Sequence, residues 1–348
     1  MGHKRSGLLY SVGTVVLLLS WLISGCSSGG SQSASAGSQS SSAGSQSAGQ
    51  SSSGLKVGFS LPALDAYYSV VQQSAQKEAK ALGVDLIIGD GVSGASPTVQ
   101  ISKVQDILVQ HPKILLISPQ GTGLIPVLNR AVQQGVKVIF IDQQIPTFTP
   151  ALSFIGTNNQ VGSTLIGNYL VKAMHGTGEV GMLLGVPGTP VSDARYQNAA
   201  NILKKAGIKV VLSSLTDACV EPTAISNFRT LLLANPQMNA AYTICGPDGM
   251  AVAQVLGEKP RQGFICSSFD LEDQQARDIA AGKCDAAIAQ LPVKLGESSV
   301  TWAKKVAGGA SIPKVIDNGT TLVTKANINC WYHGAGDGYS YPISPCSS

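Results

Sequence analysis

The chain has little of what enzymes and metal-binding proteins use. Only 13% of its 348 residues are charged, 5% are aromatic, and four are histidines. No Walker A, G-x-S-x-G or H-E-x-x-H pattern occurs, and no cysteine pair has C-x-x-C spacing. These absences predict a protein without catalytic residues, without a metal site and without a cofactor.

The charge is also small and dispersed. The formal net charge is +4, and because Lys4 and Arg5 lie in the first 25 residues, the rest of the chain carries +2. Basic residues cluster no further than two Lys-Lys doublets. Nucleic-acid-binding proteins concentrate basic residues on one face, so the sequence argues against a nucleic-acid partner.

No apolar run reaches the ~20 residues that a membrane-spanning helix needs. A shorter, interrupted run at residues 8–23 follows a basic start, which predicts a secretory signal over residues 1–25. Its end, Ile23-Ser24-Gly25-Cys26, resembles the lipobox of bacterial lipoproteins. That resemblance implies that Cys26 is acylated and anchors the mature chain outside the cytoplasmic membrane.

Residues 26–54 contain, after Cys26, almost only serine, glycine, alanine and glutamine. Such a composition offers too little apolar surface to offset the entropy of ordering the chain. We therefore expect a flexible linker whose root-mean-square reach is on the order of 30 Å.

Six cysteines remain when Cys26 is set aside. An even number in an exported protein predicts disulfides, and six cysteines allow 15 pairings. We expect Cys330 to pair with Cys346, because this bond would close a short tail loop. We also expect Cys219 to pair with Cys245, because both follow predicted strands of neighbouring units.

From Leu55 onward, short apolar strands alternate with amphipathic helices. Strands are predicted to begin near residues 55, 84, 113, 136, 178, 208, 239, 263 and 285. Helices are predicted over 67–82, 97–110, 159–174, 192–206, 223–234 and 293–307. Near-continuous apolar strands separated by helices indicate parallel sheets covered on both faces, and therefore a doubly wound α/β fold.

One glycine motif is misleading. The segment GTGEVG at 176–181 matches G-x-G-x-x-G, the pattern of a dinucleotide-binding turn. Here the glycines precede a predicted strand instead of following one. We therefore expect a helix-to-strand loop that binds no nucleotide.

Polar residues gather directly after the predicted strands. In open α/β sheets, ligands bind beyond the carboxyl ends of the strands. Carboxylates and amides hydrogen-bond to hydroxyl groups, and aromatic rings cover the C–H face of a sugar, so this set suits a neutral polyhydroxylated ligand. The candidate ligand-binding residues are Asp65, Tyr67, Tyr68, Ser118, Asp142, Gln143, Arg195, Asp270 and Gln290.

Several of these residues have a purely structural alternative. An aspartate that closes a buried strand often caps the following helix, which is the alternative for Asp142 and Asp270. Either tyrosine could pack between helices. Arg195 could pair with Asp193 on a surface turn, and Gln290 could serve as a hinge neighbour as well as a ligand contact.

The body from about residue 55 to 325 resembles the ribose-binding-protein family, the type I periplasmic-type substrate-binding proteins of sugar ABC transporters. No single motif is diagnostic, but their order along the chain is specific. The motifs include AQKEAKALG at 75, KILLISP at 113, VIFID at 138, FIGTNN at 154, GVPGTPVSDAR at 185 and AAIAQLP at 286.

The resemblance implies that the nine candidate residues contact the ligand, although the sequence departs from the family in places. Ribose binders commonly have asparagine where this chain has Ser118 and arginine where it has Gln143. The segment at 243–250 looks about two residues longer than its family equivalent, which leaves Asp248 open as a contact. The sequence therefore does not identify the sugar.

The resemblance also implies two Rossmann-like lobes joined by three hinge segments. We expect one lobe to comprise 55–156 and 291–321, and the other to comprise 157–290 and 322–348. The hinges are expected near Phe154–Asn158, Gln290–Pro292 and Asp317–Leu322. The tail from residue 326 lies beyond the resemblance, and we expect it to be a disulfide-closed loop braced against one lobe.

The function implied is that of a monomeric, lipid-anchored binding protein. It would capture a monosaccharide or polyol by closing two lobes and deliver it to an ABC permease. A sugar-sensing receptor that partners a chemoreceptor or histidine kinase would use the same fold. An anchored hydrolase, with Asp142 and Asp270 as paired carboxylates, is a third reading.

Overall fold

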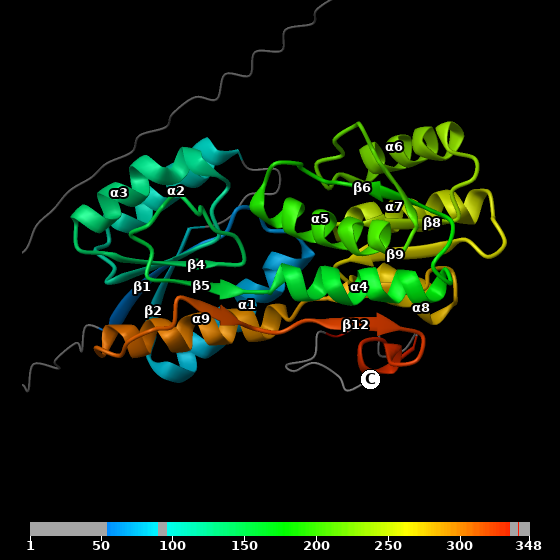
Figure 1. The fold of residues 1–348 in the computed structure, drawn as a ribbon. Coiled ribbons are helices and arrows are strands. Elements are labelled where there is room, and N and C mark those ends of the chain that lie inside the picture. The colour runs from blue at the N-terminus through cyan, green and yellow to red at the C-terminus, as the bar shows by residue number, and fades with distance from the viewer. Residues whose placement is uncertain (1–53, 90–95, 335–339, 341–348) are drawn as a thin grey trace, which may run out of the picture. The chain divides into compact units, whose positions relative to one another are not determined.

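The computed structural model describes residues 54–89, 96–334 and Ser340. The predicted signal, Cys26, the linker up to residue 53 and Cys346 lie outside these residues. The described body contains two six-stranded sheets with helices packed against them (Figure 1). Within the described residues, no helix is both long and hydrophobic enough to cross a membrane.

The first sheet is entirely parallel. Its strands in spatial order are β11 (Val315–Asp317), β5 (Ser153–Gly156), β4 (Lys137–Ile141), β3 (Ile114–Ile117), β1 (Leu55–Ser60) and β2 (Val84–Gly89). Strand β3 reads Ile-Leu-Leu-Ile and is buried along its whole length. Such unbroken apolar strands form because helices cover both faces of the sheet.

The second sheet repeats this order with one antiparallel edge strand, β12, which pairs with β10. Its strands in spatial order are β12 (Thr321–Thr324), β10 (Ala286–Ala289), β9 (Ile265–Phe269), β8 (Ala240–Thr243), β6 (Glu179–Leu183) and β7 (Lys209–Leu212). The two sheets confirm the predicted doubly wound α/β fold.

Helices sandwich each sheet, and four clusters of buried hydrophobic residues lie between helices and strands. On the first sheet, α1 (Ala66–Leu82) and α9 (Pro292–Ala307) pack together on one face, and α2 (Pro97–Leu108) and α3 (Ile125–Gln133) cover the other. On the second sheet, the faces are covered by α4 (Asn159–Ala173) with α5 (Pro190–Lys205), and by α6 (Glu221–Ala234), α7 (Gly246–Glu258) and α8 (Asp273–Ala280).

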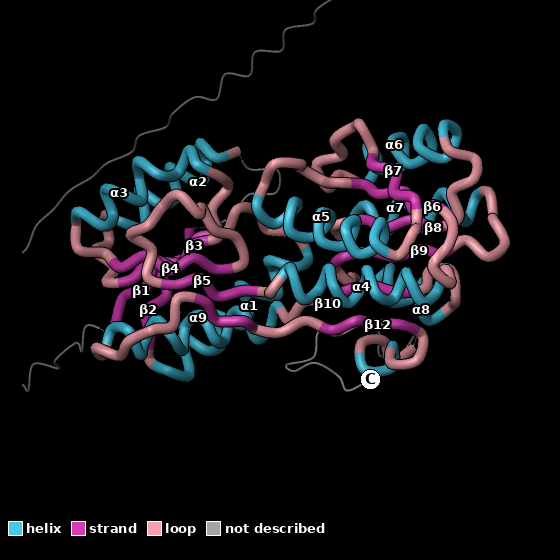
Figure 2. The backbone as a smooth tube through the Cα atoms, viewed as in Figure 1, coloured by secondary structure: helices cyan, strands magenta, loops and turns pink. Residues whose placement is uncertain are grey.

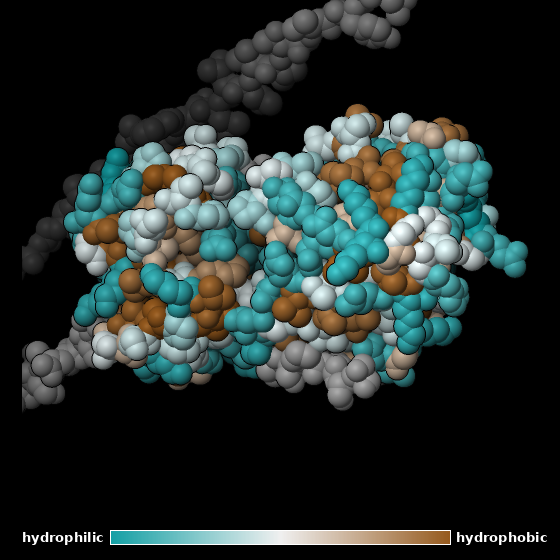
Figure 3. All heavy atoms as spheres, in the orientation of Figure 1, coloured by the Kyte–Doolittle hydropathy of each residue, from teal (hydrophilic) through white to brown (hydrophobic). Residues whose placement is uncertain are grey.

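On the outer surface, hydrophobic residues form separate patches among hydrophilic ones on the face drawn in Figure 3. Isolated exposed apolar residues are ordinary on the surface of a folded domain. The large apolar side chains are instead concentrated in the four buried clusters.

The chain passes from one sheet to the other three times. It leaves the first sheet after β5 to enter α4, returns after β10 to enter α9, and crosses again between β11 and β12 (Figure 2). These crossings coincide with the segments that the sequence suggests as hinges. Each sheet is consequently built from discontinuous stretches of sequence.

Three helices, α3, α7 and α8, are absent from the predicted elements. The first residues of α7 are Gly246, Pro247, Asp248 and Gly249, which are typical of turns. Proline is nevertheless well suited to the first turn of a helix, because the amide hydrogen it lacks would have no helical partner there.

The glycine motif at 176–181 forms the predicted helix-to-strand loop. Gly176 and Gly178 adopt positive φ angles of 70° and 105°, and β6 starts at Glu179. The motif therefore lies at the amino end of a strand, away from the edge where nucleotides bind.

The tail after β12 packs onto the second sheet's helices. Ile328 and Trp331 are buried in the same hydrophobic cluster as residues of α6, α7 and α8. Trp331 is completely buried. The described part of the tail is thus braced against the second lobe, as the sequence suggests.

Candidate functional site

A cavity of about 370 Å³ lies where residues following strands of both sheets meet. This volume suits a ligand of monosaccharide size. The cavity collects all but one of the predicted ligand-binding residues. Those that line it are Asp65, Tyr67, Tyr68, Asp142, Gln143, Arg195, Asp270 and Gln290.

The first lobe contributes the start of α1. Asp65 is the N-cap of this helix, and its Oδ1 accepts a 2.8 Å hydrogen bond from the Tyr68 backbone N–H. The cap fixes the first helical turn, so that Tyr67 and Tyr68 both reach the cavity. Their rings meet edge to face with centroids 5.3 Å apart.

Asp142 follows β4 and accepts hydrogen bonds from both tyrosines. The Tyr68 hydroxyl lies 2.5 Å from Oδ2 and the Tyr67 hydroxyl 3.2 Å from Oδ1. The residue has a positive φ of 59°, a conformation that aspartate tolerates better than most residues. No helix follows Asp142 before β5, so the helix-cap alternative does not apply to it. Burial raises the pKa of its carboxyl group, against hydrogen bonding from Tyr68.

Ser118 is the predicted contact that does not line the cavity. It is completely buried at the end of β3, and its hydroxyl lies 3.2 Å from the Tyr68 hydroxyl. Gln143, on the cavity side, also donates to the Tyr68 hydroxyl over 3.2 Å. Ser118 therefore orients Tyr68 from behind.

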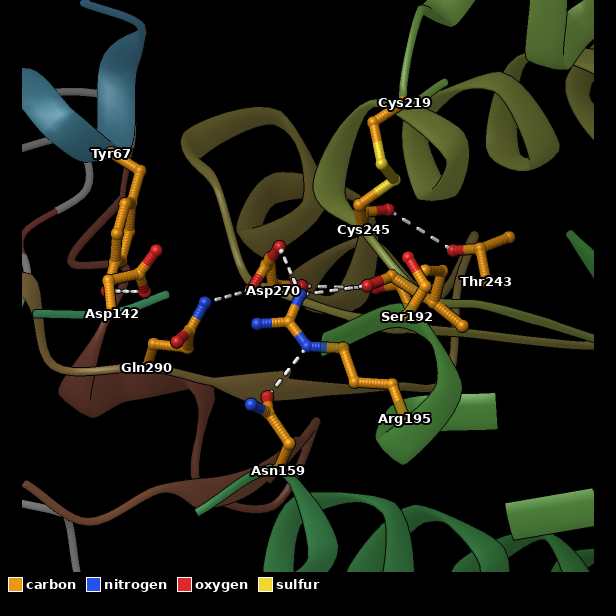
Figure 4. A network of polar contacts seen from close by, with 12 residues as sticks. Tyr67, Asp142, Asn159, Ser192, Arg195, Cys219, Thr243, Cys245, Asp270 and Gln290 are labelled. Carbon is orange, nitrogen blue, oxygen red and sulfur yellow. Dashed lines mark hydrogen bonds and ion pairs between the residues drawn. A yellow bond between two sulfur atoms is a disulfide. The ribbon is translucent and has the colours of Figure 1, made fainter. Parts of the chain in front are cut away.

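The second lobe contributes Arg195, on α5, which is almost fully buried. Its Nη1 lies 3.2 Å from Asp270 Oδ2 and donates to the Ile244 carbonyl, while its Nε donates to Asn159 (Figure 4). The guanidinium also stacks 3.9 Å above the ring centre of Phe269. Arg195 thus pairs with Asp270, and the alternative pairing with Asp193 is wrong.

Asp270 follows β9 and links Arg195 to Gln290. Gln290 Nε2 donates to Asp270 Oδ1 over 2.5 Å, on the opposite side of the carboxylate from Arg195 (Figure 4). Asp270 has a positive φ of 70° and retains 21% side-chain exposure. The cap of α8 is Glu272 instead, so the helix-cap alternative is wrong for Asp270 too.

The predicted disulfide Cys219–Cys245 is present, and the structure shows that both cysteines line the cavity. Ala218 and Cys219 adopt positive φ angles of 53° and 57° in the loop before α6, which brings Cys219 over Cys245 at the start of α7. Figure 4 shows this bond beside the Arg195–Asp270 pair.

Two further cysteine findings concern the pairing pattern. Cys266, in β9, is bonded to Cys284, just before the neighbouring strand β10. Cys330 is also disulfide-bonded. Its predicted partner, Cys346, lies outside the described residues.

Behind the disulfide, Asp217 and Asp248 form a buried carboxyl pair. With the two cysteines they make a group of metal-ligand type, but the cysteine sulfurs are bonded to each other. Burial, followed by the charge of Asp217, raises the pKa of Asp248 to about 9, so this carboxyl group is neutral at physiological pH. Asp248 is completely buried and does not line the cavity.

Glu272 lines the cavity but is missing from the predicted set. It follows Asp270 by two residues in the segment FDLED. The acidic residues Glu272 and Asp273 shortly after Asp270 are the sequence signal that could have identified it. Burial, followed by the charges of Asp270 and Asp65, raises the pKa of Glu272 to about 7. Asn159 was also missed, because its role is to hold Arg195.

Comparison with known proteins places this architecture among binding proteins. A family model described as a periplasmic binding protein domain matches residues 57–311. The ribose import binding protein RbsB of Escherichia coli is 26% identical over 260 residues, which cover 74% of this chain and 86% of that protein.

Solved structures give the same picture. An ABC transporter solute binding protein from Mycobacterium smegmatis, with bound glycerol, superposes with a TM-score of 0.75 at 27% identity, over 82% of this chain and 99% of that one. A solute binding protein from Burkholderia graminis, in complex with D-arabinose, has a TM-score of 0.74 at 24% identity, over 80% of this chain and 97% of that one. The second likeness supports the fold alone.

Proposed function

Because the chain belongs to the periplasmic binding protein domain family, we propose that it captures a monosaccharide or polyol outside the cytoplasm and delivers it to an ABC permease. The observation that carries this proposal is the meeting of Asp142 and Asp270, which come from different sheets, in one cavity of about 370 Å³. Carboxylates accept paired hydrogen bonds from neighbouring hydroxyl groups.

The remaining cavity residues complete a sugar site. Tyr67 and Tyr68 present aromatic surface suited to the C–H face of a sugar ring. Gln290 and Gln143 add amide groups, and Arg195 holds Asp270 in place. The positions are fixed by contacts within each lobe, so that the site is pre-organised before ligand arrives.

We propose that binding closes the two lobes. The lobes are 55–156 with 291–321, and 157–290 with 322–348, and their three crossings act as hinges. A ligand that contacts both lobes stabilises the closed arrangement over the open one, and so shifts the population towards it. The permease then recognises the closed form.

The proposal also covers how the protein is attached to the membrane and whether it alters its ligand. Cys26 carries the lipid, residues 26–54 supply slack between the anchor and the body, and the protein acts as a monomer. No bond of the ligand is broken. Asp270 is paired with Arg195, and Asp142 accepts two tyrosine hydroxyls, so neither carboxylate is arranged to move a proton onto a glycosidic oxygen.

Isothermal titration calorimetry of the full chain against a panel of pentoses, hexoses and polyols tests the proposal. We expect one saturable ligand, recovered unchanged. Asp142→Ala and Asp270→Ala should each weaken its binding by about thirty-fold, the equivalent of about 2 kcal/mol for a hydrogen bond to a charged group.

Asp106→Ala, on the exposed side of α2, is the matched control and should bind as the parent does. Equal binding by the parent and both cavity variants would place the site elsewhere. Recovery of a cleaved or altered sugar would instead support the hydrolase.

A further inference from the structure

The cavity carries a large excess of negative charge. Four carboxylates line it, Asp65, Asp142, Asp270 and Glu272, against a single basic side chain, Arg195, among the lining residues that the structure describes. A neutral sugar needs no such excess, because a hydroxyl group both donates and accepts hydrogen bonds. The imbalance therefore bears on the charge of the ligand.

Arg195 is held by residues of its own lobe and offsets only part of this negative charge. Its side chain is 7% exposed and is held by Asp270, Asn159 and the Ile244 carbonyl. Asp65 and Glu272 lie outside this set of contacts. The ion pair engages Asp270, and the charge of Arg195 also reaches Asp142, but no other lining residue that the structure describes is basic.

Several hydrogen-bond donors of the cavity have acceptors within the protein. The Tyr67 and Tyr68 hydroxyls donate to Asp142, and the Gln143 and Gln290 amides donate to the Tyr68 hydroxyl and to Asp270. These particular bonds are made inside the protein, and each amide nitrogen keeps a second N–H that can donate to a ligand. The excess of carboxylates over basic side chains, rather than a lack of donors, is what distinguishes the cavity.

Gln290 adds an unpaired hydrogen-bond acceptor to the cavity. The residue is 6% exposed, and its Oε1 is buried without a hydrogen-bond partner within the described part of the chain. A buried acceptor left unpaired is costly, so a donor from the ligand would relieve it. A hydroxyl or ammonium group of the ligand can supply this donor.

An ammonium group has three donors and no acceptor. We propose that the ligand is a polyhydroxylated amine, an amino sugar or amino polyol, whose ammonium group lies among Glu272, Asp65 and Asp270 while its hydroxyl groups contact Asp142 and Gln290. This proposal rests on the proposed function and specifies the ligand class of the same cavity.

The grouping of the three carboxylates is supported by their mutual repulsion. Burial and then the charges of Asp270, Asp65 and Glu221 raise the pKa of Glu272 to about 7. Loss of hydration and the charge of Asp270 raise the pKa of Asp65, against the hydrogen bond from the Tyr68 backbone N–H. An ammonium ion placed among them removes this repulsion. The ligand's charge would then stabilise the closed arrangement in addition to its hydroxyl contacts.

Calorimetry with matched pairs of probes tests the proposal on the full chain. The pairs are D-glucosamine with D-glucose, D-galactosamine with D-galactose, and 1-amino-1-deoxy-D-sorbitol with D-sorbitol. We expect the amine of at least one pair to bind about ten-fold or more tightly than its neutral counterpart, with an advantage that shrinks at high salt.

Two variants locate the ammonium group. Glu272→Gln should weaken binding of that amine by about ten-fold and leave the neutral counterpart within about two-fold. Glu258→Gln, whose parent residue is paired with Arg229 on the surface, is the control and should leave both unchanged.

The outcomes separate the two proposals. A neutral probe that binds as tightly as its amine overturns the amine proposal and leaves the proposed function standing. A panel in which neither neutral nor amino probes bind contradicts both. If Ca²⁺ alone raises the melting temperature and Glu272→Gln abolishes that shift, the carboxylates form a metal site and the amine proposal is wrong.

Discussion

Arg195 Nη1 lies 3.2 Å from Asp270 Oδ2, and this ion pair joins α5 to the end of β9 at the cavity wall. The arginine is almost fully buried, while the aspartate keeps contact with the cavity. A buried charge that loses its partner is costly. The pair should therefore matter to folding as well as to binding.

We expect Asp270→Asn to lower the free energy of unfolding by about 2 kcal/mol, because Arg195 would keep two neutral acceptors but lose its charged one. Denaturant unfolding followed by circular dichroism measures the change. Glu258→Gln breaks the exposed Arg229–Glu258 pair and should cost less than about 1 kcal/mol. Equal losses in the two variants would show that burial of Arg195 contributes nothing.

The two tyrosines should differ in their contribution to stability. Tyr68→Phe removes the 2.5 Å hydrogen bond to Asp142 and also leaves Ser118 and Gln143 without this partner. We expect a loss of about 2 kcal/mol, against about 1 kcal/mol for Tyr67→Phe, which removes a single 3.2 Å bond. The unfolding free energies of both variants check the order, and the reverse order would contradict it.

The buried carboxyl Asp248 predicts a pH dependence of stability. Burial, followed by the charge of Asp217, raises its pKa from 3.8 to about 9, so the folded state holds a proton that the unfolded state has released. The contribution of Asp248 to stability is therefore fully present below pH 3.8 and is lost as the pH rises towards about 9.

Asp248→Asn, which is neutral at every pH, isolates this effect. We expect the difference in unfolding free energy between the variant and the parent to move in favour of the variant between pH 5 and pH 9. Titrating groups that do not interact with Asp248 are common to both proteins and cancel in the difference. A difference that is flat over this range would mean that Asp248 titrates at its ordinary pKa.

Glu272 predicts a pH dependence of binding for an amine ligand. Its pKa of about 7 reflects burial and the charges of Asp270 and Asp65, and an ammonium ion would lower this pKa. For 1-amino-1-deoxy-D-sorbitol, whose alkyl amine stays protonated over this range, affinity should consequently increase from pH 6 to pH 8, with proton release on binding that calorimetry in two buffers detects. In Glu272→Gln both the increase and the proton release should diminish.

The two fully described disulfides should have separable effects. Removing Cys219–Cys245 or Cys266–Cys284 by double alanine substitution should each cost about 3 kcal/mol of stability by the loop-entropy relation. Only the first bond lines the cavity, so only its removal should also weaken ligand binding. Calorimetry at a temperature where both variants are folded checks this, and equal affinity in the two variants would contradict it.

Much of the architecture could be predicted from the sequence because strand and helix patterns alternate cleanly. The α/β fold, the family and its solute-capturing role are confirmed, as is the Cys219–Cys245 pair. The lipid anchor on Cys26 and the ligand contacts stay predictions. Helix α7 could not be recognised, because Gly246 to Gly249 read as a turn and the burial that stabilises them depends on the tertiary fold.

For the site, the sequence predicts which residues follow the strands, but not where their side chains point. A strand end shows which residues reach one edge of a sheet, and it brought eight of the nine candidates to the cavity. Side-chain direction cannot be read from a strand end, which is why the sequence predicts Ser118 as a contact although it lies behind Tyr68. Glu272 is missing from the predicted set because it lies beyond the strand end, as the N-cap of α8.

The disulfide in the cavity wall links ligand binding to the oxidation state of the chain. Cys219 and Cys245 both line the cavity, and their bond forms only under oxidising conditions. In a chain that is still in a reducing compartment, the loop before α6 is not covalently joined to the start of α7. Ligand affinity should therefore be higher in the oxidised protein than in a chain in which this bond has not formed.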